Sequence, residues 1–465
     1  MQNESRERDE AQRIHDASLS LLEDPGVRME NDAVVKALLS NGARPGSSSQ
    51  VVRFPKKMVE ERLALCPKQV VLADKRGNRS VLSSSGEPTF WTCPGMMLHE
   101  GGGVRPFTSS DMAAMSRLCE QLENVNVIFG MALDDVPPPA RDVVGLAVMA
   151  QNSTKHLRAL CFSPEGAEVM AEMRDVAGPY PWFSVGFTAH GPLRWTNLAL
   201  EIFRRTAGRG IPATVNGEPM AGVSGPVTIA GSAAVGNAEI LAGIVVNEVL
   251  EPGRPVIYNL GLAHIFDMKT AIAVTGAPEN HLFAKLSAMM GRFYDLPSAS
   301  WVSTESMCPD SQAALEKMLG FQTHVESGVA AIWGVSQLES EITVSPAQAV
   351  IDNEMIALVK RYRRGVKVTP ETLALDVTRA VGIAGSFLAE MHTAENFRSE
   401  FYMPQVLLRE KRAAWEGRGS KRLDERAAEV AAQLMRRDVE NGLDADQARA
   451  LDSMAKAFAA RMKEA

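Results

Sequence analysis

The chain has 465 residues, more than one ordinary domain needs, and this length suits an α/β barrel with extensions. Hydrophobic residues make up 45% and charged residues 23%, which predicts a large buried core and little disorder. The net charge is −7 with only 49 lysine and arginine residues, so a nucleic-acid-binding surface, which needs clustered excess cation, is not expected.

The cysteines and the longest apolar run bear on the compartment of the protein. The five cysteines are scattered without a C-x-x-C pair, a pattern typical of reduced thiols and not of disulfides or a zinc cluster. The N-terminus is polar and charged, so no secretory signal is expected. The apolar run 229–249 contains Asn237, Glu239 and Asn247 and is interpreted as a buried helix. We therefore expect a soluble, cytoplasmic protein with no membrane partner.

Residues 1–86 are predicted to form an N-terminal helical segment. Helix-period stretches cover 5–24, 31–42 and 55–64, and the third begins with Pro55, which is well tolerated in the first turn of a helix. We expect this segment to be an entry region and not the catalytic domain.

Residues 87–366 are predicted to form an α/β barrel, because short apolar runs alternate there with longer helix-period segments. Strands are expected at 89–92, 126–131, 156–162, 182–187, 212–215, 255–259, 298–302 and 329–333. Helices are expected at 139–152, 164–177, 195–207, 228–250, 278–294, 310–326 and 346–364. Eight such repeats favour a parallel sheet that closes into a barrel. No G-x-G-x-x-G follows the first strand, so a dinucleotide site is not expected.

Residues 367–465 are predicted to form a C-terminal helical annex. The strand pattern stops past Thr369, and the stretches 370–390 and 421–463 are rich in Ala, Leu, Arg and Glu, as helices are. Exposed apolar helices in this annex favour a homo-oligomer, and its last part is expected to be a cap or a docking surface.

Several motifs at the ends of the predicted strands and in the annex resemble the trimethylamine methyltransferase family, in the order in which that family has them. They span about residues 90 to 410. The motifs are 216–222 (N-G-E-P-M-A-G), 225–231 (G-P-V-T-I-A-G), 237–239 (N-A-E), 309–313, 351–354, 387–393, 397–400 and Pro404.

The resemblance implies an eight-stranded barrel that demethylates methylamines. In that family the methyl group passes to the Co(I) of a corrinoid carried by a separate partner protein, so no tightly bound cofactor is expected on this chain. Archaeal members that act on trimethylamine contain pyrrolysine in the barrel, whereas this sequence has only the twenty standard residues. It is therefore similar to the branch without pyrrolysine, which includes glycine betaine methyltransferase, and a betaine or related quaternary amine is the expected substrate.

Aromatic side chains at strand ends are the expected contacts for a quaternary ammonium group, because aromatic faces attract cations and barrel active sites lie at the carboxyl ends of the strands. Each of these aromatics is alternatively a core residue of the barrel. A strand-end histidine is a further candidate, as a contact for the carboxylate of a betaine. The predicted substrate-binding residues are Trp91, Phe187, Tyr258, His264, Trp301 and Trp333.

Two strand-end glutamates are the candidate catalytic residues. Glu218 follows a strand in a tight Asn-Gly-Glu-Pro loop, where it either pairs with the substrate cation or caps the helix that begins near Thr228. Glu305 follows the next-to-last predicted strand in a similar position. No H-x-E-x-H-type pair occurs, so no catalytic metal bound by the protein is expected.

A glycine-rich turn precedes the helix that starts near residue 228. Gly225 and Thr228 are its candidate cofactor-binding residues, because a helix N-terminus attracts anions such as the phosphate of the corrinoid or a substrate carboxylate. A tight loop with proline in the first helical turn is an equally good interpretation.

Two other functions stay open on the sequence. One is methyl transfer from a betaine directly to tetrahydrofolate, with Glu218, Asp267 or Asn259 as the pterin contact. The other is a non-catalytic barrel that binds betaines as a sensor or an assembly subunit.

Overall fold

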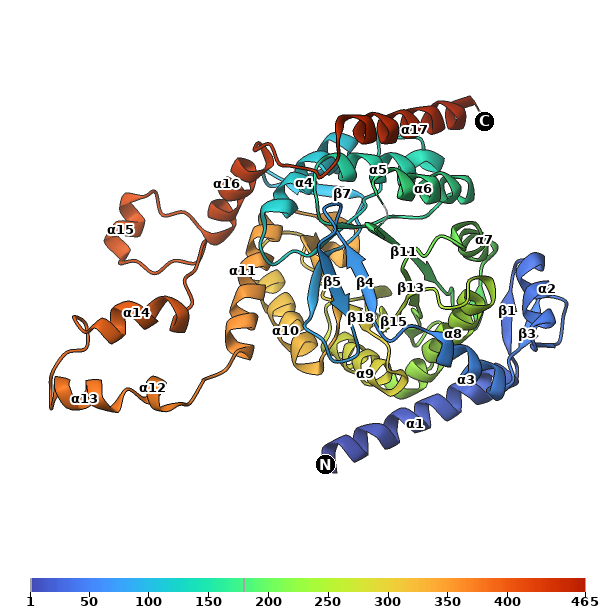
Figure 1. The fold of residues 1–465 in the computed structure, drawn as a ribbon, viewed down its shortest axis with the longest axis horizontal. Coiled ribbons are helices and arrows are strands. Elements are labelled where there is room, and N and C mark those ends of the chain that lie inside the picture. Colours follow the sequence, from blue (N-terminus) through green and yellow to red (C-terminus); the bar gives the residue numbers. More distant parts are fainter. Residues whose placement is uncertain (1, 179, 465) are drawn as a thin grey trace.

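The computed structural model describes residues 2–178 and 180–464, and eight parallel strands close into a barrel in the order β10-β11-β13-β15-β18-β19-β6-β9 (Figure 1). The barrel closes where Trp91 pairs with Val127 and Thr89 with Ala331. Each predicted strand overlaps one of these, so the predicted barrel is confirmed. The strands are β6 (Thr89–Thr92), β9 (Val127–Phe129), β10 (His156–Arg158), β11 (Phe183–Thr188), β13 (Ala213–Asn216), β15 (Val256–Gly261), β18 (Ser298–Trp301) and β19 (Ala331–Val335).

A ring of helices surrounds the barrel and follows the predicted positions. The exception is α4, which was not predicted and begins at a capping box made by Thr108 and Asp111. Asp310 and Ser345 cap the starts of α10 and α11 in the same way, through side-chain oxygens that accept from backbone N–H groups. The helices are α4 (Ser109–Gln121), α5 (Arg141–Gln151), α6 (Pro164–Val176), α7 (Asn197–Thr206), α8 (Ile229–Leu250), α9 (Pro278–Tyr294), α10 (Ser311–Ser327) and α11 (Pro346–Arg363).

The barrel has one core inside its strands and another between strands and helices, because successive strand residues face opposite sides. On β6, Trp91 lies in the inner core, and Phe90 packs outward against Phe321 of α10, with ring centroids 6.1 Å apart. The hairpin of β4 (Val70–Ala73) and β5 (Arg79–Leu82) contributes to the inner core and closes the end from which the strands begin (Figure 1).

The N-terminal segment contains the three predicted helices, α1 (Gln2–Glu23), α2 (Asp32–Ser40) and α3 (Lys56–Leu65). It also contains strands that the helical prediction missed, because runs of two or three residues carry no readable alternation. Met29 of β1 (Val27–Met29) pairs with Trp195 of β12 (Arg194–Trp195), so this segment is joined to the barrel by a small sheet. The same sheet includes β2 (Arg44–Pro45) and β3 (Val51–Arg53).

Helix α8 is the apolar run that the sequence analysis interpreted as a buried helix. Within the described part of the chain it is the one helix long and apolar enough to cross a bilayer, with a mean hydropathy of 1.7. However, 72% of its apolar window is buried, and it packs between α1, α3 and the strands β13 and β15. Its apolar character is therefore that of a core helix.

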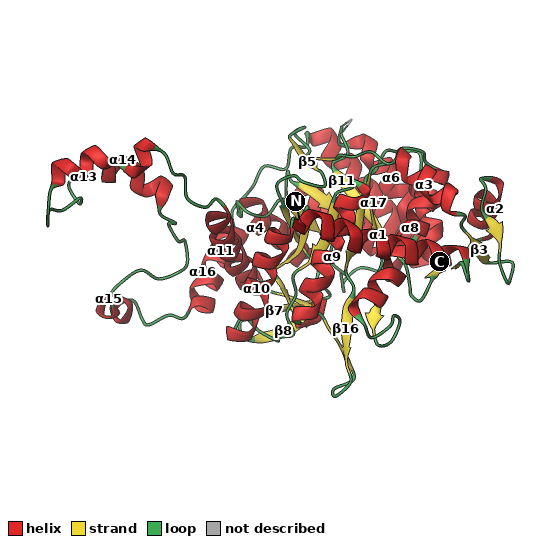
Figure 2. Cartoon of the chain, turned by 90° about the horizontal axis from the view of Figure 1, so that it is seen from below, coloured by secondary structure: helices red, strands yellow, loops and turns green. Residues whose placement is uncertain are grey.

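Loops at the carboxyl ends of the strands carry extra β structure on one face of the barrel. The hairpins β7 (Met97–Glu100)–β8 (Gly103–Pro106) and β16 (His264–Asp267)–β17 (Ile272–Val274) project on the same side (Figure 2). The remaining short strands, β14 (Met220–Ala221), β20 (Gln337–Leu338) and β21 (Thr343–Val344), also follow barrel strands.

The C-terminal annex has two parts with different packing. Helices α16 (Leu423–Met435) and α17 (Ala445–Glu464) pack on α4, α5, α6 and α11. Between α11 and α16, residues 365–420 extend away from the barrel, and we call this segment the arm (Figures 1 and 2). The predicted helix 370–390 is interrupted there, because Ala374 adopts a left-handed conformation with φ 49°. The arm helices are α12 (Pro370–Leu373), α13 (Leu375–Val381), α14 (Met391–Glu400) and α15 (Arg412–Gly417).

Candidate active site

A cavity of about 270 Å³ lies at the carboxyl ends of β10, β11, β13 and β19, where barrel enzymes place their active sites. Its volume is close to the lower end of the range for small-molecule pockets, about 300–1,000 Å³. The wall combines apolar side chains with a few charged ones. The residues that matter below are Phe129, Arg158, Leu160, Phe187, Glu218, Leu262, Trp333 and Glu341.

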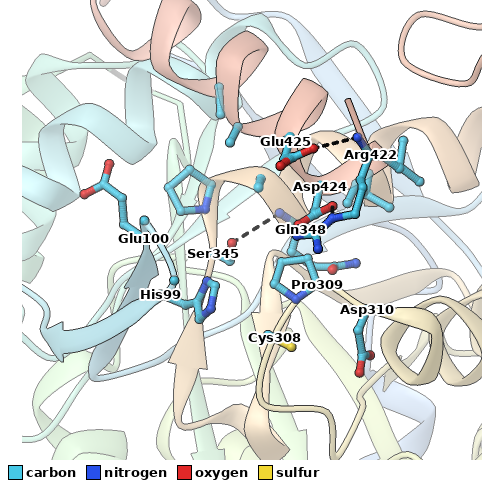
Figure 3. A pocket seen from close by; sticks show the side chains of 18 of the residues that line it. His99, Glu100, Cys308, Pro309, Asp310, Ser345, Gln348, Arg422, Asp424 and Glu425 are labelled. Atoms are coloured by element: carbon cyan, nitrogen blue, oxygen red, sulfur yellow. Dashed lines mark hydrogen bonds and ion pairs between the residues drawn. The ribbon is translucent and has the colours of Figure 1, made fainter. Parts of the chain in front are cut away.

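A second hollow, of about 910 Å³, lies outside the barrel between the β7–β8 hairpin, the starts of α10 and α11, and α16 (Figure 3). Its polar groups bond to one another: Arg422 pairs with Asp424 at 2.8 Å, and Ser345 Oγ accepts from the Gln348 backbone N–H. The smaller cavity is the better candidate because Arg158, Glu218 and Glu341, which line it, form no ion pair among the described residues.

Arg158 is the last residue of β10 and its side chain points into the barrel. Only 3% of its surface is exposed, and its Nε and Nη1 have no hydrogen-bond partner among the described residues. The guanidinium lies over the rings of Phe129 and Trp333, with Cζ 5.3 and 5.8 Å from the two ring centroids. Burial lowers its pKa to about 9. The protein thus holds a cation in this cavity without a counter-charge.

Glu218 and Glu341 face the same cavity from the loops after β13 and β19. Burial raises the pKa of Glu218 to about 7, and no hydrogen bond reaches its side chain from the described residues. Burial, followed by the charge of Glu218, raises the pKa of Glu341 to about 8, although the Cys93 thiol donates a hydrogen bond to it at 3.6 Å. Two carboxyl groups therefore lie close together, and a cation placed between them would favour their ionised forms.

The loop that carries Glu341 is strained and firmly held. Glu339, Ser340 and Glu341 have φ values of 52°, 49° and 80°, and each such non-glycine residue costs about 1–3 kcal/mol. Backbone N–H groups of Glu339 and Ser340 donate to Ser306 and Thr304 at 2.9 Å. Strain of this kind persists only where surrounding contacts over-determine it, as they do at functional sites.

The carboxylate of Glu305 is one of those contacts. It accepts hydrogen bonds from the backbone of Thr275 at 2.6 Å and Gly276 at 2.9 Å, and from Ser340 Oγ at 2.9 Å. Glu305 is not among the residues that line the cavity. Its geometry is that of a group that positions the Ser340–Glu341 loop.

A buried ion pair holds the first part of the same loop. Lys317 Nζ on α10 lies 2.6 Å from Asp352 on α11, and both side chains are fully buried. Lys317 also donates to the carbonyls of Gly334 and Gln337, and Asp352 accepts from the Ser336 N–H. The chain between β19 and Glu341 is thus fixed to two barrel helices.

Two of the predicted substrate contacts, Trp91 and Trp333, lie one behind the other. Trp333 lines the cavity, whereas Trp91 stacks on its far side, with ring centroids 5.9 Å apart and an interplanar angle of 25°. Trp91 donates its indole N–H to Thr89 Oγ1, so its one hydrogen-bond donor is satisfied within the barrel core. Trp333 Nε1 is buried, and no described residue forms a hydrogen bond with it.

The remaining predicted contacts point elsewhere. Phe187 borders the cavity, but its ring stacks on Phe203 of α7 at 3.5 Å between centroids, in the layer outside the strands. Tyr258 also faces outward and donates to Asn237 of α8 at 2.8 Å. The ring centroids of Trp301 and His264 lie 6.4 Å apart, and neither residue lines the cavity.

The glycine-rich turn lies on the rim of the barrel mouth. Thr228 is exposed and its side chain makes no capping hydrogen bond, and neither it nor Gly225 lines the cavity. Among the predicted residues the cavity therefore brings together Glu218, Trp333 and the edge of Phe187. No group of three or more His, Cys, Asp or Glu suited to a metal occurs in the residues that the structure describes.

Arg158 and Glu341 were missed on sequence. Arg158 carries a readable signal, since it is a charged residue at the end of an apolar strand, in phase with the inward-facing His156. Glu341 carries none, because it lies in an irregular loop whose path is fixed by contacts with residues distant in sequence, among them 304–306 and 352.

A closed α/β barrel with a small charged cavity at the carboxyl ends of its strands defines a barrel enzyme that acts on a small molecule. The chain matches the description of the trimethylamine methyltransferase (MTTB) family over residues 2–465 and belongs to that family. It is therefore a methyltransferase of that family.

Characterised relatives cover nearly the whole chain. A trimethylamine methyltransferase of Desulfitobacterium hafniense (strain DSM 10664 / DCB-2) is 30% identical over 91% of this chain and 87% of its own length. A glycine betaine methyltransferase of Desulfitobacterium hafniense (strain Y51) is 27% identical over 88% and 87%. The monomethylamine methyltransferase of Methanosarcina barkeri has the same fold, with a TM-score of 0.50 at 13% identity over 87% of this chain and 85% of its own.

Proposed function

We propose that the protein demethylates a quaternary amine, glycine betaine or a related betaine, and transfers the methyl group to the Co(I) of a corrinoid held by a separate protein. The observation that carries this proposal is the pair of half-buried carboxyl groups, Glu218 and Glu341, which line one cavity without a cationic partner among the described residues. A quaternary ammonium group has no N–H to donate, and it matches this pair together with an apolar wall that includes Leu160, Leu262 and Trp333.

The chemistry asks little of the protein beyond binding and positioning. Co(I), a co-substrate on its carrier protein, supplies the nucleophile. The nitrogen keeps the electron pair of the broken C–N bond and leaves as a tertiary amine, so no general acid is needed. Glu218 and Glu341 hold the cation, Trp333 packs beside it, and the fixed loop behind Glu305 and Lys317 keeps the methyl group in line. Glu305 thus acts through the Ser340–Glu341 loop and does not touch the substrate.

The rim of the mouth fits a protein partner. Large apolar side chains are exposed on several strand-to-helix loops around the cavity. Exposed apolar patches of this kind are typical of surfaces that bind another protein. A carrier protein that docks there would bring its corrinoid to the cavity, with Gly225 and Thr228 at the edge of the contact. The exposed residues are Met96, Phe162, Leu198, Val223, Val227, Met268, Met307 and Ile342.

The arm supports a homo-oligomer. Of residues 365–420 only Val406 is buried, and Ile383, Leu388 and Met391 are more than two-thirds exposed. Helices of four to ten residues are not stable in water without packing. A second copy of the chain is the partner that is always present to cover them.

The function is tested by anaerobic assay of methyl transfer to cob(I)alamin, followed by its absorbance, with glycine betaine as the donor. Methylated cobalamin and dimethylglycine in equal amounts are expected, and Glu218→Gln should lower the rate of formation of both at a limiting betaine concentration. Asp438→Asn, at an exposed position between α16 and α17, is the control and should retain activity. Methyl transfer to tetrahydrofolate in the absence of cobalt would contradict the corrinoid acceptor and support direct transfer to folate. Betaine binding without transfer to either acceptor would leave a non-catalytic barrel.

A further inference from the structure

We propose that Arg158 forms a carboxylate-binding subsite in the cavity, so that the site selects quaternary amines that carry a carboxylate over those that carry none. The inference rests on the proposed function for its cationic half, the contact of Glu218 and Glu341 with the ammonium group. It assigns Arg158 as the residue that determines specificity.

The first observation is that space for the guanidinium is built into the barrel. Gly186 on β11 faces Arg158, and a Cβ at this position would come within 1.5 Å of Nη2. Arg158 is 97% buried, and Nε and Nη1 lack partners in the described structure. A buried unpaired charge costs several kcal/mol, and the protein tolerates this cost at the wall of a cavity that an anion can enter.

Arg254 provides the internal comparison. It is also buried and also lies over an aromatic ring, with Cζ 5.4 Å from the centroid of Phe187. However, Arg254 donates to the Ile211 carbonyl at 2.9 Å and to Thr206 Oγ1 at 3.1 Å. Where a buried guanidinium is structural in this chain, backbone and side-chain acceptors satisfy it. Arg158 has no such acceptors, so its role lies with a ligand.

The second observation is that the cavity keeps its opposite charges apart. Arg158 forms no ion pair with Glu218 or Glu341 among the described residues, and it is not among the groups that shift the pKa of either carboxyl. A simple anion would satisfy Arg158 but face two carboxylates, and a simple cation would leave Arg158 unpaired. A zwitterion with its two charges separated by a short spacer satisfies both walls of a cavity of about 270 Å³.

Three probes with related head groups test the subsite: glycine betaine, choline and tetramethylammonium, each titrated by calorimetry into the full-length protein. We expect wild type to bind glycine betaine at least about 30-fold more tightly than choline, and Arg158→Gln to weaken glycine betaine about 100-fold while changing choline less than about threefold. Gly186→Ala, which displaces the guanidinium and keeps its charge, should have the same effect on selectivity.

Arg254→Gln is the matched control, since it removes a buried guanidinium outside the cavity and should leave the ratio of the two affinities unchanged. Retained choline binding reports that each variant is folded. Equal wild-type affinities for glycine betaine and choline, or an equal loss of both in Arg158→Gln, would overturn the subsite.

Methyl transfer to cob(I)alamin separates this inference from the proposed function. If glycine betaine binding depends on Arg158 but no methyl group moves, the subsite stands and the methyltransferase proposal for betaines fails. If choline and glycine betaine donate methyl groups equally well in wild type and in Arg158→Gln, the subsite fails and demethylation of quaternary amines stands.

Discussion

The cavity at the barrel mouth and the arm of residues 365–420 differ in the kind of group that each leaves without a partner. In the cavity, Arg158 is a buried charge, and Glu218 and Glu341 are half-buried carboxyl groups with raised pKa values. In the arm, side chains such as Ile383 and Leu388 are apolar groups left in water. The unpaired charges of the cavity fit a small polar ligand, and the exposed apolar side chains of the arm fit a protein surface.

The two regions also differ in how they are held. The loop behind the cavity is fixed by the Lys317–Asp352 pair and by Glu305. The arm is tied to the body at its base, where Arg361 donates to the Glu400 carbonyl and Glu354 accepts from Tyr402 Oη at 2.6 Å. Rigid positioning suits a site that must align a reacting group, whereas an arm anchored at its base suits a contact that forms on assembly.

The largest effect is expected from Asp352→Asn, which leaves the Lys317 ammonium buried without a counter-charge. Loss of one partner of a buried pair costs about 3–5 kcal/mol, so the free energy of unfolding in urea should fall by that amount. Asp376→Asn, which removes an exposed ion pair with Arg379 in the arm, should leave it unchanged. Equal effects would show that the barrel mouth is not the more firmly held region.

Glu218→Gln combined with Glu341→Gln should weaken glycine betaine binding about 100-fold, or about 2.7 kcal/mol, because both counter-charges of the ammonium group are lost. Calorimetry measures this, and the oligomer mass by light scattering should not change. Undiminished binding would remove the carboxyl pair from the site.

Ile383→Asp with Leu388→Asp places two charges on the arm. If the arm packs on a second copy, burial of these charges should weaken assembly by about 2 kcal/mol, roughly 30-fold in the dissociation constant. Light scattering over a range of protein concentrations reads this out, and glycine betaine binding to the separated chains serves as the control. An unchanged mass at every concentration would contradict an arm-mediated oligomer.

The smallest effect is a dependence on pH. Burial raises the pKa of Glu218 to about 7 and of Glu341 to about 8, so glycine betaine affinity should rise about tenfold between about pH 6 and 8.5 as both ionise. The protonated forms stabilise the ligand-free protein: this contribution is complete below about pH 4.5 and is lost as the pH rises through 7 and 8. The Gln double variant should show neither trend.

Local patterns were enough to predict most of the fold. Each barrel strand is a short apolar run and each helix a longer periodic segment, and both depend on residues that are near in sequence. The short strands β1 to β3 and the interruption at Ala374 were missed, since they depend on distant partners or on a single backbone conformation. The helix α4 was missed although its Thr108–Asp111 capping box is a local signal.

The sequence by itself determined the barrel, its order of elements, its family and three residues that line the cavity, Glu218, Trp333 and Phe187. Only the tertiary structure decided that Tyr258 and the ring of Phe187 face the helices, that Trp91 stands behind Trp333, and that Arg158 and Glu341 share a cavity. The physical reason is that one step along a strand reverses the direction of a side chain, and barrel closure then brings together residues more than a hundred positions apart.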